Sequence, residues 1–205
     1  MAADTLILIL LSIAVFCGLL QRVLDRMYLT DRQALLIIAL MIIGTFIPNL
    51  QMGPVAINIG GGIIPLGICA VLFLKANTGY ERLRAVIGSL ITGMTICLIS
   101  SLLPAEAEQL PLDPLWLYCI AGGLIAWVIG RSRRCAFICG ITGVLLADVF
   151  SGLHARMQGY TMDLVLGGGG IADAAVIAGT AAVLFCELIG EAIERIVRKS
   201  SFAEN

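Results

Sequence analysis

Long apolar runs alternate with short polar segments along this chain of 205 residues. A transmembrane helix needs about 20 predominantly apolar residues to cross the roughly 30 Å hydrocarbon core of a bilayer, and the runs lie near that length. The pattern therefore predicts an all-α polytopic membrane protein with about seven transmembrane helices. The predicted helices are 5–20, 34–47, 63–74, 83–103, 115–129, 135–150 and 171–189.

The composition supports a membrane protein with a single membrane domain over residues 1–205. Hydrophobic residues make up 60% of the chain and charged residues 13%, against about 25% charged in soluble proteins. The net charge is -1 and basic residues are confined to short loops, which gives no support to nucleic-acid binding. Cys135 and Cys139 are too small a set to indicate a metal site. The lipid bilayer is the expected partner, and no metal or cofactor is predicted.

The basic residues predict how the chain is oriented. Twelve of the thirteen Lys and Arg residues fall in alternate connections, namely 22–32, 75–84, 131–134 and 195–199, and only Arg156 breaks the pattern. Cytoplasmic loops carry an excess of Lys and Arg. We therefore expect the N-terminus outside and the C-terminus in the cytoplasm, in the inner (cytoplasmic) membrane.

The two halves of the chain resemble each other. The glycine-rich segment 59–65 lines up with 167–173 at an offset of 108, and each is followed by a helix of small residues. Both copies would enter the membrane in the same direction, which predicts two parallel three-helix repeats. The predicted organisation is repeat 1 at about 5–75, a connector span at 83–103, repeat 2 at about 115–189 and a short cytoplasmic tail at 190–205.

An extended segment precedes each glycine run. Residues 55–59 alternate in size and are β-branched, which favours a strand, and 163–166 are their counterpart. A helix over 63–74 would rise only about 18 Å, short of the hydrocarbon core. We therefore expect two glycine-linked arms that dip in from the outer side and can pair with each other. The alternative is that the glycines lie in ordinary outer loops and allow tight helix packing.

Two aspartates, Asp148 and Asp173, lie within apolar runs at the same expected depth, near the end of the sixth span and the start of the seventh. A carboxylate in lipid is costly and indicates a functional site. If these antiparallel helices pack together, the two carboxyl groups approach each other. Two such groups in a low dielectric cannot both ionise cheaply, so one is expected to hold a proton while the other acts as a base. This arrangement can activate water against an amide.

The sequence Gly-Ile-Ala-Asp at 170–173 resembles the Gly-x-Gly-Asp motif of intramembrane aspartyl proteases such as presenilin, signal peptide peptidase and prepilin peptidase. In those enzymes the second aspartate lies on the preceding helix, where Asp148 stands. The resemblance implies hydrolysis of a peptide bond in a membrane-embedded substrate. The chain departs from the motif at Ala172, which replaces the second glycine, and it lacks the Pro-Ala-Leu sequence of that group.

Over its whole length the chain is more similar to a bacterial and archaeal membrane family named domain of unknown function sixteen-fourteen. The similarity lies in Asn-Ile-Gly-Gly at 58–61, Arg-Ser-Arg-Arg at 131–134, Leu-Ala-Asp at 146–148 and Gly-Glu at 190–191. This resemblance implies no particular activity.

We predict from these features that Asp148 and Asp173 are the catalytic residues of a peptide-bond hydrolase. An extended peptide could add to the edge of either arm, and Asn58 or the glycine amides could orient its carbonyl. The candidate substrate-binding residues are Asn58, Gly60, Gly61, Gly62, Pro65, Gly168, Gly169 and Gly170.

Two alternatives to a hydrolase would give the same aspartates different roles. Duplicated halves, glycine-broken elements and acidic residues in the membrane are also features of proton- or ion-coupled transporters and channels, in which the aspartates would be the binding site. In a non-catalytic structural protein they would cap helix ends, with Asp173 well placed at a helix N-terminus.

Overall fold

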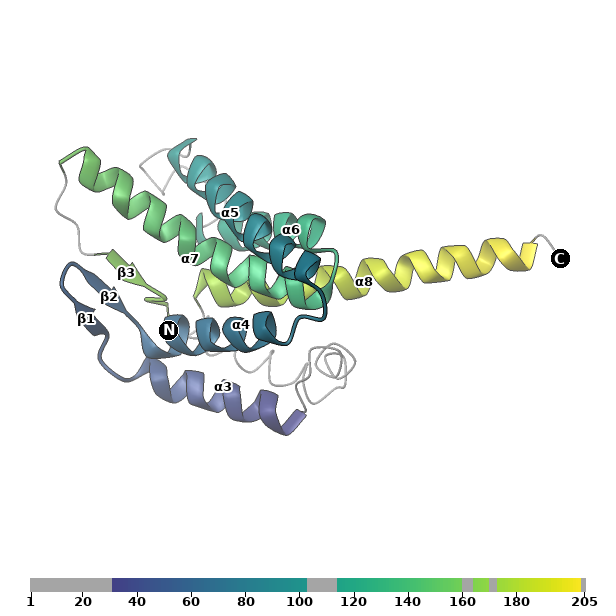
Figure 1. The fold of residues 1–205 in the computed structure, drawn as a ribbon, viewed down its shortest axis with the longest axis horizontal. Helices are drawn as coiled ribbons and strands as arrows, with labels where there is room; N and C mark the ends of the chain where they lie inside the picture. Colours follow the sequence, from purple (N-terminus) through teal and green to yellow (C-terminus); the bar gives the residue numbers. More distant parts are fainter. Residues whose placement is uncertain (1–30, 103–113, 160–163, 170–172, 204–205) are drawn as a thin grey trace.

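The computed structural model describes residues 31–102, 114–159, 164–169 and 173–203, which form six α-helices, one π-helix and three short strands (Figure 1). The mostly helical fold is as predicted. Each of the last six apolar runs overlaps a helix, and the first run, 5–20, lies outside the described residues. The elements are α3 (Asp31–Thr45), β1 (Leu50–Met52), β2 (Val55–Ile57), η1 (Ile59–Ile63), α4 (Ile64–Leu74), α5 (Gly79–Leu102), α6 (Pro114–Gly130), α7 (Arg133–Met157), β3 (Leu164–Leu166) and α8 (Ala174–Ala203).

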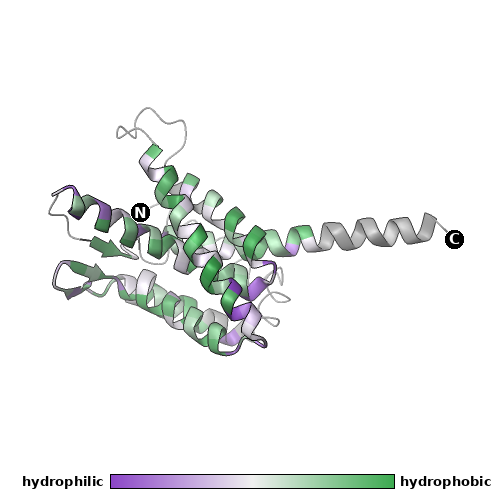
Figure 2. Ribbon diagram, turned by 45° about the horizontal axis from the view of Figure 1, so that its top comes forward, coloured by the Kyte–Doolittle hydropathy of each residue, from purple (hydrophilic) through white to green (hydrophobic). Residues whose placement is uncertain are grey.

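Two of the described helices, α5 and α7, are long and apolar enough to cross a membrane. The exposed positions of α5 from Leu83 to Leu98 are apolar, and Figure 2 shows mostly hydrophobic residues along the coloured helices. Contiguous apolar surface on this scale is unusual for a protein surrounded by water and favours contact with lipid. The exposed apolar residues of α5 include Leu83, Val86, Ile87, Leu90, Ile91, Met94 and Leu98.

Small residues let the four helices α5 to α8 pack closely. A Cβ atom added to Gly140 of α7 would lie 2.6 Å from the Cα of Gly179 in α8. A Cβ added to Gly143, also on α7, would lie 2.6 Å from the Cβ of Thr92 in α5. Glycine at the contact between helices is typical of membrane proteins, because it brings the two backbones together. The core is therefore built on α7, which packs against α5 on one side and α8 on another.

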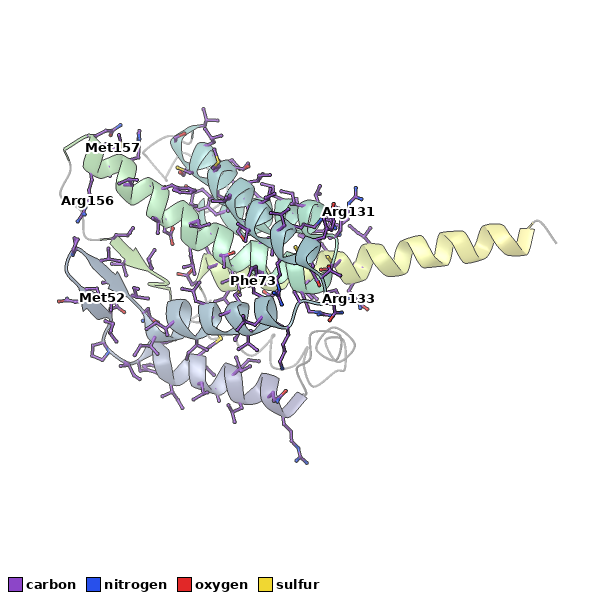
Figure 3. All side chains as sticks on the ribbon, viewed as in Figure 1. Met52, Phe73, Arg131, Arg133, Arg156 and Met157 are labelled. Carbon is purple, nitrogen blue, oxygen red and sulfur yellow. The ribbon has the colours of Figure 1, made fainter. Side chains whose placement is uncertain are left out.

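The helices place the polar segments at two opposite ends of the bundle. The strand end consists of β1 to β3 and the end of α7, where Figure 3 labels Met52, Arg156 and Met157. The arginine end consists of the turn between α6 and α7, where Arg131 and Arg133 are labelled, and the turn between α4 and α5. Arg156, the exception to the charge pattern, thus lies at the strand end.

A three-stranded sheet in the order β1-β2-β3 covers the strand end. β1 and β2 are antiparallel and joined through Gly53, whose φ of 65° allows the tight turn. β2 and β3 are parallel, with Val55 opposite Leu164. The strands predicted in the two arms are therefore present, and they pair with each other. Their register differs by one residue from the alignment of the two halves, which would place Val55 opposite Asp163.

The first glycine run differs from its predicted role as a linker, because Gly60, Gly61 and Gly62 lie inside a helix. They form η1, which continues directly into α4. The Asn58 side chain starts this helix by accepting a hydrogen bond from the Gly61 N–H at 3.0 Å. A Cβ on Gly60 would lie 2.3 Å from the carbonyl oxygen of Met41 in α3, so glycine is required there for close packing. The close packing agrees with the alternative interpretation, whereas the outer loop in which that interpretation placed these glycines is a helix.

Candidate functional site

Asp173 is the N-cap of α8. Its Oδ1 atom accepts a hydrogen bond from the Ala175 N–H at 2.9 Å, and its Oδ2 atom accepts one from the Gly169 N–H at 3.1 Å. Its side chain is buried, with 9% of the residue exposed. Backbone N–H donors and the helix dipole both stabilise negative charge at this position. The structure therefore fixes the carboxylate of Asp173 and gives it the capping role considered for it above.

Asp148 lies on α7, half-buried, and no described residue forms a hydrogen bond with its carboxylate. Helices α7 and α8 pack directly against each other through Gly140 and Gly179. A Cβ on Gly152, one turn after Asp148, would lie 2.8 Å from the Leu164 side chain of β3, so this part of α7 lies at the strand end. The two predicted aspartates thus lie on neighbouring helices, one held by two backbone donors and the other without a hydrogen bond among the described residues.

The second glycine run lies beside this pair. Gly167 has a φ of 68°, and Gly168 and Gly169 are exposed. The N–H of Gly169 already donates to Asp173, while Gly170 lies outside the described residues.

The other candidate substrate-binding residues form hydrogen bonds within the protein or are buried in its helices. Asn58 is buried, and besides capping η1 it donates a hydrogen bond from Nδ2 to Oδ1 of Asn49 at 2.9 Å. Gly60, Gly61 and Gly62 are buried in η1, and Pro65 is buried in the first turn of α4. These residues build the strand end, and the positions open to a ligand near Asp173 are Gly168 and Gly169.

The sheet leaves one strand edge open beside the aspartates. β2 lies between β1 and β3, so it has no free edge. On the side of β3 that faces β2, the Leu164 N–H donates to the Pro54 carbonyl at 3.1 Å, and the Leu166 carbonyl accepts from the Asn58 N–H at 3.0 Å. The N–H and C=O of Val165 point the other way, because successive residues of a strand alternate in direction. They bond to no described residue. The sequence predicted that either arm could provide the edge for a peptide. Because β2 pairs with β1 on one side and with β3 on the other, the edge is that of β3.

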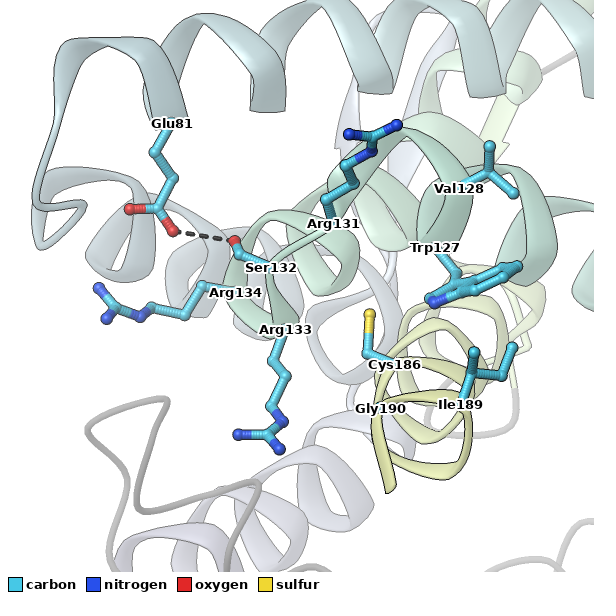
Figure 4. A pocket seen from close by; sticks show the side chains of 10 residues that line it. All are labelled: Glu81, Trp127, Val128, Arg131, Ser132, Arg133, Arg134, Cys186, Ile189 and Gly190. Carbon is cyan, nitrogen blue, oxygen red and sulfur yellow. Dashed lines mark hydrogen bonds between the residues drawn. The ribbon is translucent and has the colours of Figure 1, made fainter. Parts of the chain in front are cut away.

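A cavity of about 690 Å³ lies at the other end of the bundle, the arginine end (Figure 4). Its lining includes Arg131, Ser132 and Arg133 from the turn between α6 and α7, together with Trp127 of α6 and Cys186 of α8. From the sequence, these arginines indicated the orientation of the chain and the family resemblance, and not a binding site. The clustering of three arginines in four residues was the signal that could have indicated a site.

The fold and the site define a mostly helical protein that has two helices able to cross a membrane and a pair of aspartates beside a small sheet. The chain belongs to the family described as "Protein of unknown function (DUF1614)", which matches residues 16–185. This confirms the family to which the whole-length resemblance pointed. No curated protein and no solved structure matches the chain.

Proposed function

We propose that this protein hydrolyses a peptide bond of a membrane-embedded substrate, with Asp148 and Asp173 as the catalytic pair. The observation that carries the proposal is the placement of two carboxylates on neighbouring, directly packed helices, α7 and α8, within an apolar bundle. Two carboxylates in such a place titrate as a pair that shares a proton. One deprotonated and one protonated carboxyl group are what amide hydrolysis by water requires.

The hydrogen bonds suggest a role for each aspartate. Asp173 accepts two backbone N–H groups, which stabilise a charged carboxylate, and is assigned as the base that removes a proton from the attacking water. Asp148 has no donor among the described residues and is assigned the shared proton, which it gives to the carbonyl oxygen of the substrate. The proton that Asp173 took from water then passes to the amide nitrogen and the C–N bond of the tetrahedral diol breaks. One diol hydroxyl becomes the C=O of the new carboxyl group and returns its proton to Asp148.

The free edge of β3 supports binding of an extended substrate next to this pair. A peptide bond must be in an extended segment for a carboxylate to approach it from either side. Main-chain hydrogen bonds from a peptide to the Val165 N–H and C=O would add a fourth strand to the sheet. Gly169, four residues after Val165, donates its N–H to the Asp173 carboxylate, so a peptide on β3 would extend toward that residue.

The proposed setting is the inner membrane, with seven spans and the N-terminus outside. The apolar outer face of α5 supports contact with lipid, and the grouping of basic residues at the arginine end supports a cytoplasmic position for that end. The aspartates and the sheet then lie toward the outer side, and the substrate would be cut there.

The experiment compares Asp148→Asn and Asp173→Asn, singly, in protein reconstituted into liposomes, and measures both peptide cleavage and proton or ion flux. Glu81→Gln, which removes a carboxylate at the arginine end, is the matched control. We expect each aspartate substitution to abolish cleavage, the control to retain it, and flux to stay at background throughout. Coupled flux that is lost with either aspartate would establish transport instead, and cleavage that survives both substitutions would refute the proposal.

A further inference from the structure

The cavity at the arginine end has a mixed lining that suits an amphipathic anion. Arg131, Ser132 and Arg133 provide its polar side, and Val128 and Ile189 provide apolar surface next to it. Its volume of about 690 Å³ is in the usual range for a small-molecule site. It is separate from the aspartates, which lie toward the strand end and do not line it.

Arg131 has an unusual backbone conformation. Its φ is 51°, and it is the only non-glycine residue with a positive φ among those the structure describes. It directly follows α6, a position at which glycine is strongly favoured because the left-handed conformation strains other residues. The neighbouring glycine, Gly130, is required for a different reason, since a Cβ there would lie 2.6 Å from the Cα of Ala136. An arginine thus occupies a position at which glycine would relieve the backbone strain. Backbone strain of this kind is typical of functional positions.

Among the described residues, no acid compensates the charge of Arg131. Arg133 forms an ion pair with Glu187 of α8. Arg134 donates a hydrogen bond to the Lys75 carbonyl at 3.3 Å. The carboxylate in the described part of the lining is Glu81, which accepts hydrogen bonds from the Ser132 hydroxyl at 2.9 Å and the Asn77 N–H at 3.3 Å.

Arg131 itself is exposed, and its guanidinium pairs with no described acid. Figure 4 shows it at the turn, with Trp127 on the adjacent helix.

We propose that this cavity binds a phosphate group, with Arg131 as its principal ligand, and that the bound molecule is an anionic phospholipid at its headgroup. A guanidinium presents paired donors that match phosphate oxygens. Basic pockets between helices at the membrane surface bind anionic headgroups, and the apolar Val128 and Ile189 would contact the start of an acyl chain. A soluble phosphate ester shares the headgroup chemistry, and the experiment distinguishes these two sources.

The test uses the full chain in nanodiscs of phosphatidylcholine alone or mixed equally with phosphatidylglycerol, and in detergent with inorganic phosphate. Retained lipid is measured by native mass spectrometry and stabilisation by thermal unfolding. Arg131→Gly removes the guanidinium and relieves the backbone strain, Arg131→Gln removes it and keeps the strain, and Arg156→Gln removes an arginine at the opposite end.

We expect wild type and Arg156→Gln to retain phosphatidylglycerol over phosphatidylcholine, and both Arg131 variants to lose that preference by about tenfold or more. Arg131→Gly should unfold at a temperature equal to or above that of wild type, so weaker binding cannot be ascribed to misfolding.

Stabilisation by inorganic phosphate alone, lost in both Arg131 variants, would assign the site to a soluble phosphate ester. Equal retention of the two lipids without any response to phosphate, or unchanged binding in the Arg131 variants, would overturn the proposal.

Discussion

Replacing Asp148 by asparagine should leave the folded protein at least as stable as wild type, whereas replacing Asp173 by alanine should destabilise it. The difference follows from their hydrogen bonds. Asp173→Ala removes the acceptor of two backbone N–H groups, those of Ala175 and Gly169. Loss of an N-cap costs about 0.5–2 kcal/mol. The second bond adds about 1 kcal/mol at most, because Gly169 is exposed and its N–H can turn to water.

The total for Asp173→Ala is therefore about 2 kcal/mol, which corresponds to a melting temperature about 4–8 °C lower for a chain of this size. Asp173→Asn keeps an oxygen for the Ala175 N–H but places an NH₂ group toward Gly169, so it should lose about half as much. Asp148→Asn loses no hydrogen bond to a described residue, and the amide cannot ionise, so the variant avoids any cost of a charged group in apolar surroundings. A stability equal to that of wild type, or up to about 1 kcal/mol higher, is expected, as at other sites where function opposes stability.

The assay is thermal unfolding of the purified full chain in detergent, followed by circular dichroism, with Asp173→Asn as the intermediate case. The predicted order of melting temperature is Asp148→Asn, then Asp173→Asn, then Asp173→Ala. If Asp148→Asn lowers the melting temperature as much as Asp173→Ala does, Asp148 is a structural residue and the catalytic assignment fails.

Three further predictions test the surrounding structure. Gly140→Val should lower the free energy of unfolding by about 2 kcal/mol or more, since even a Cβ at this position would clash with the α8 backbone. Gly67→Ala, whose Cβ would meet no atom within 4 Å, should leave the free energy of unfolding nearly unchanged. Val165→Pro should preserve the fold but weaken peptide binding, because the N–H that it removes faces away from β2. Leu164→Pro should instead destabilise the sheet, because it removes the hydrogen bond to the Pro54 carbonyl. Equal effects of the two substitutions on peptide binding would contradict the proposal that the edge of β3 binds the peptide. Asn58→Ala should lower the free energy of unfolding by about 2–3 kcal/mol through loss of a buried cap, measured by chemical denaturation, and a loss below about 0.5 kcal/mol would contradict that role.

The elements of the fold could largely be predicted from the sequence, because apolar runs and β-branched alternation are local signals. β2 and β3 lie within the predicted arms. β1 was missed because Leu50–Met52 has three residues and no alternation, although the Gly-Pro pair that follows is a turn signal. The helical state of the first glycine run could not be predicted, because it depends on the Asn58 cap and on contact with Met41 of α3.

The sequence predicted which side chains form the candidate site, but not the groups that surround them. That Asp148 and Asp173 lie on neighbouring helices follows from the order of the last two apolar runs. The donors that hold Asp173 depend on the path of the second glycine run, which no spacing rule gives. The cavity at the arginine end is lined by residues of three helices and a turn in which Arg131 has a left-handed conformation, and neither feature has a local sequence signal.

Binding of a peptide that carries a hydroxyl-bearing tetrahedral isostere in place of its scissile amide tests the central claim most directly. Such a group mimics the diol intermediate and needs both carboxylates, and a transition-state analogue binds far more tightly than a substrate. Calorimetry on the reconstituted protein should show binding to wild type and to Glu81→Gln, and a loss of about a hundredfold or more in Asp148→Asn and in Asp173→Asn. Equal affinity for wild type and both aspartate variants, or no binding by wild type to isosteres of varied flanking sequence, would contradict the claim that these two aspartates form a catalytic pair.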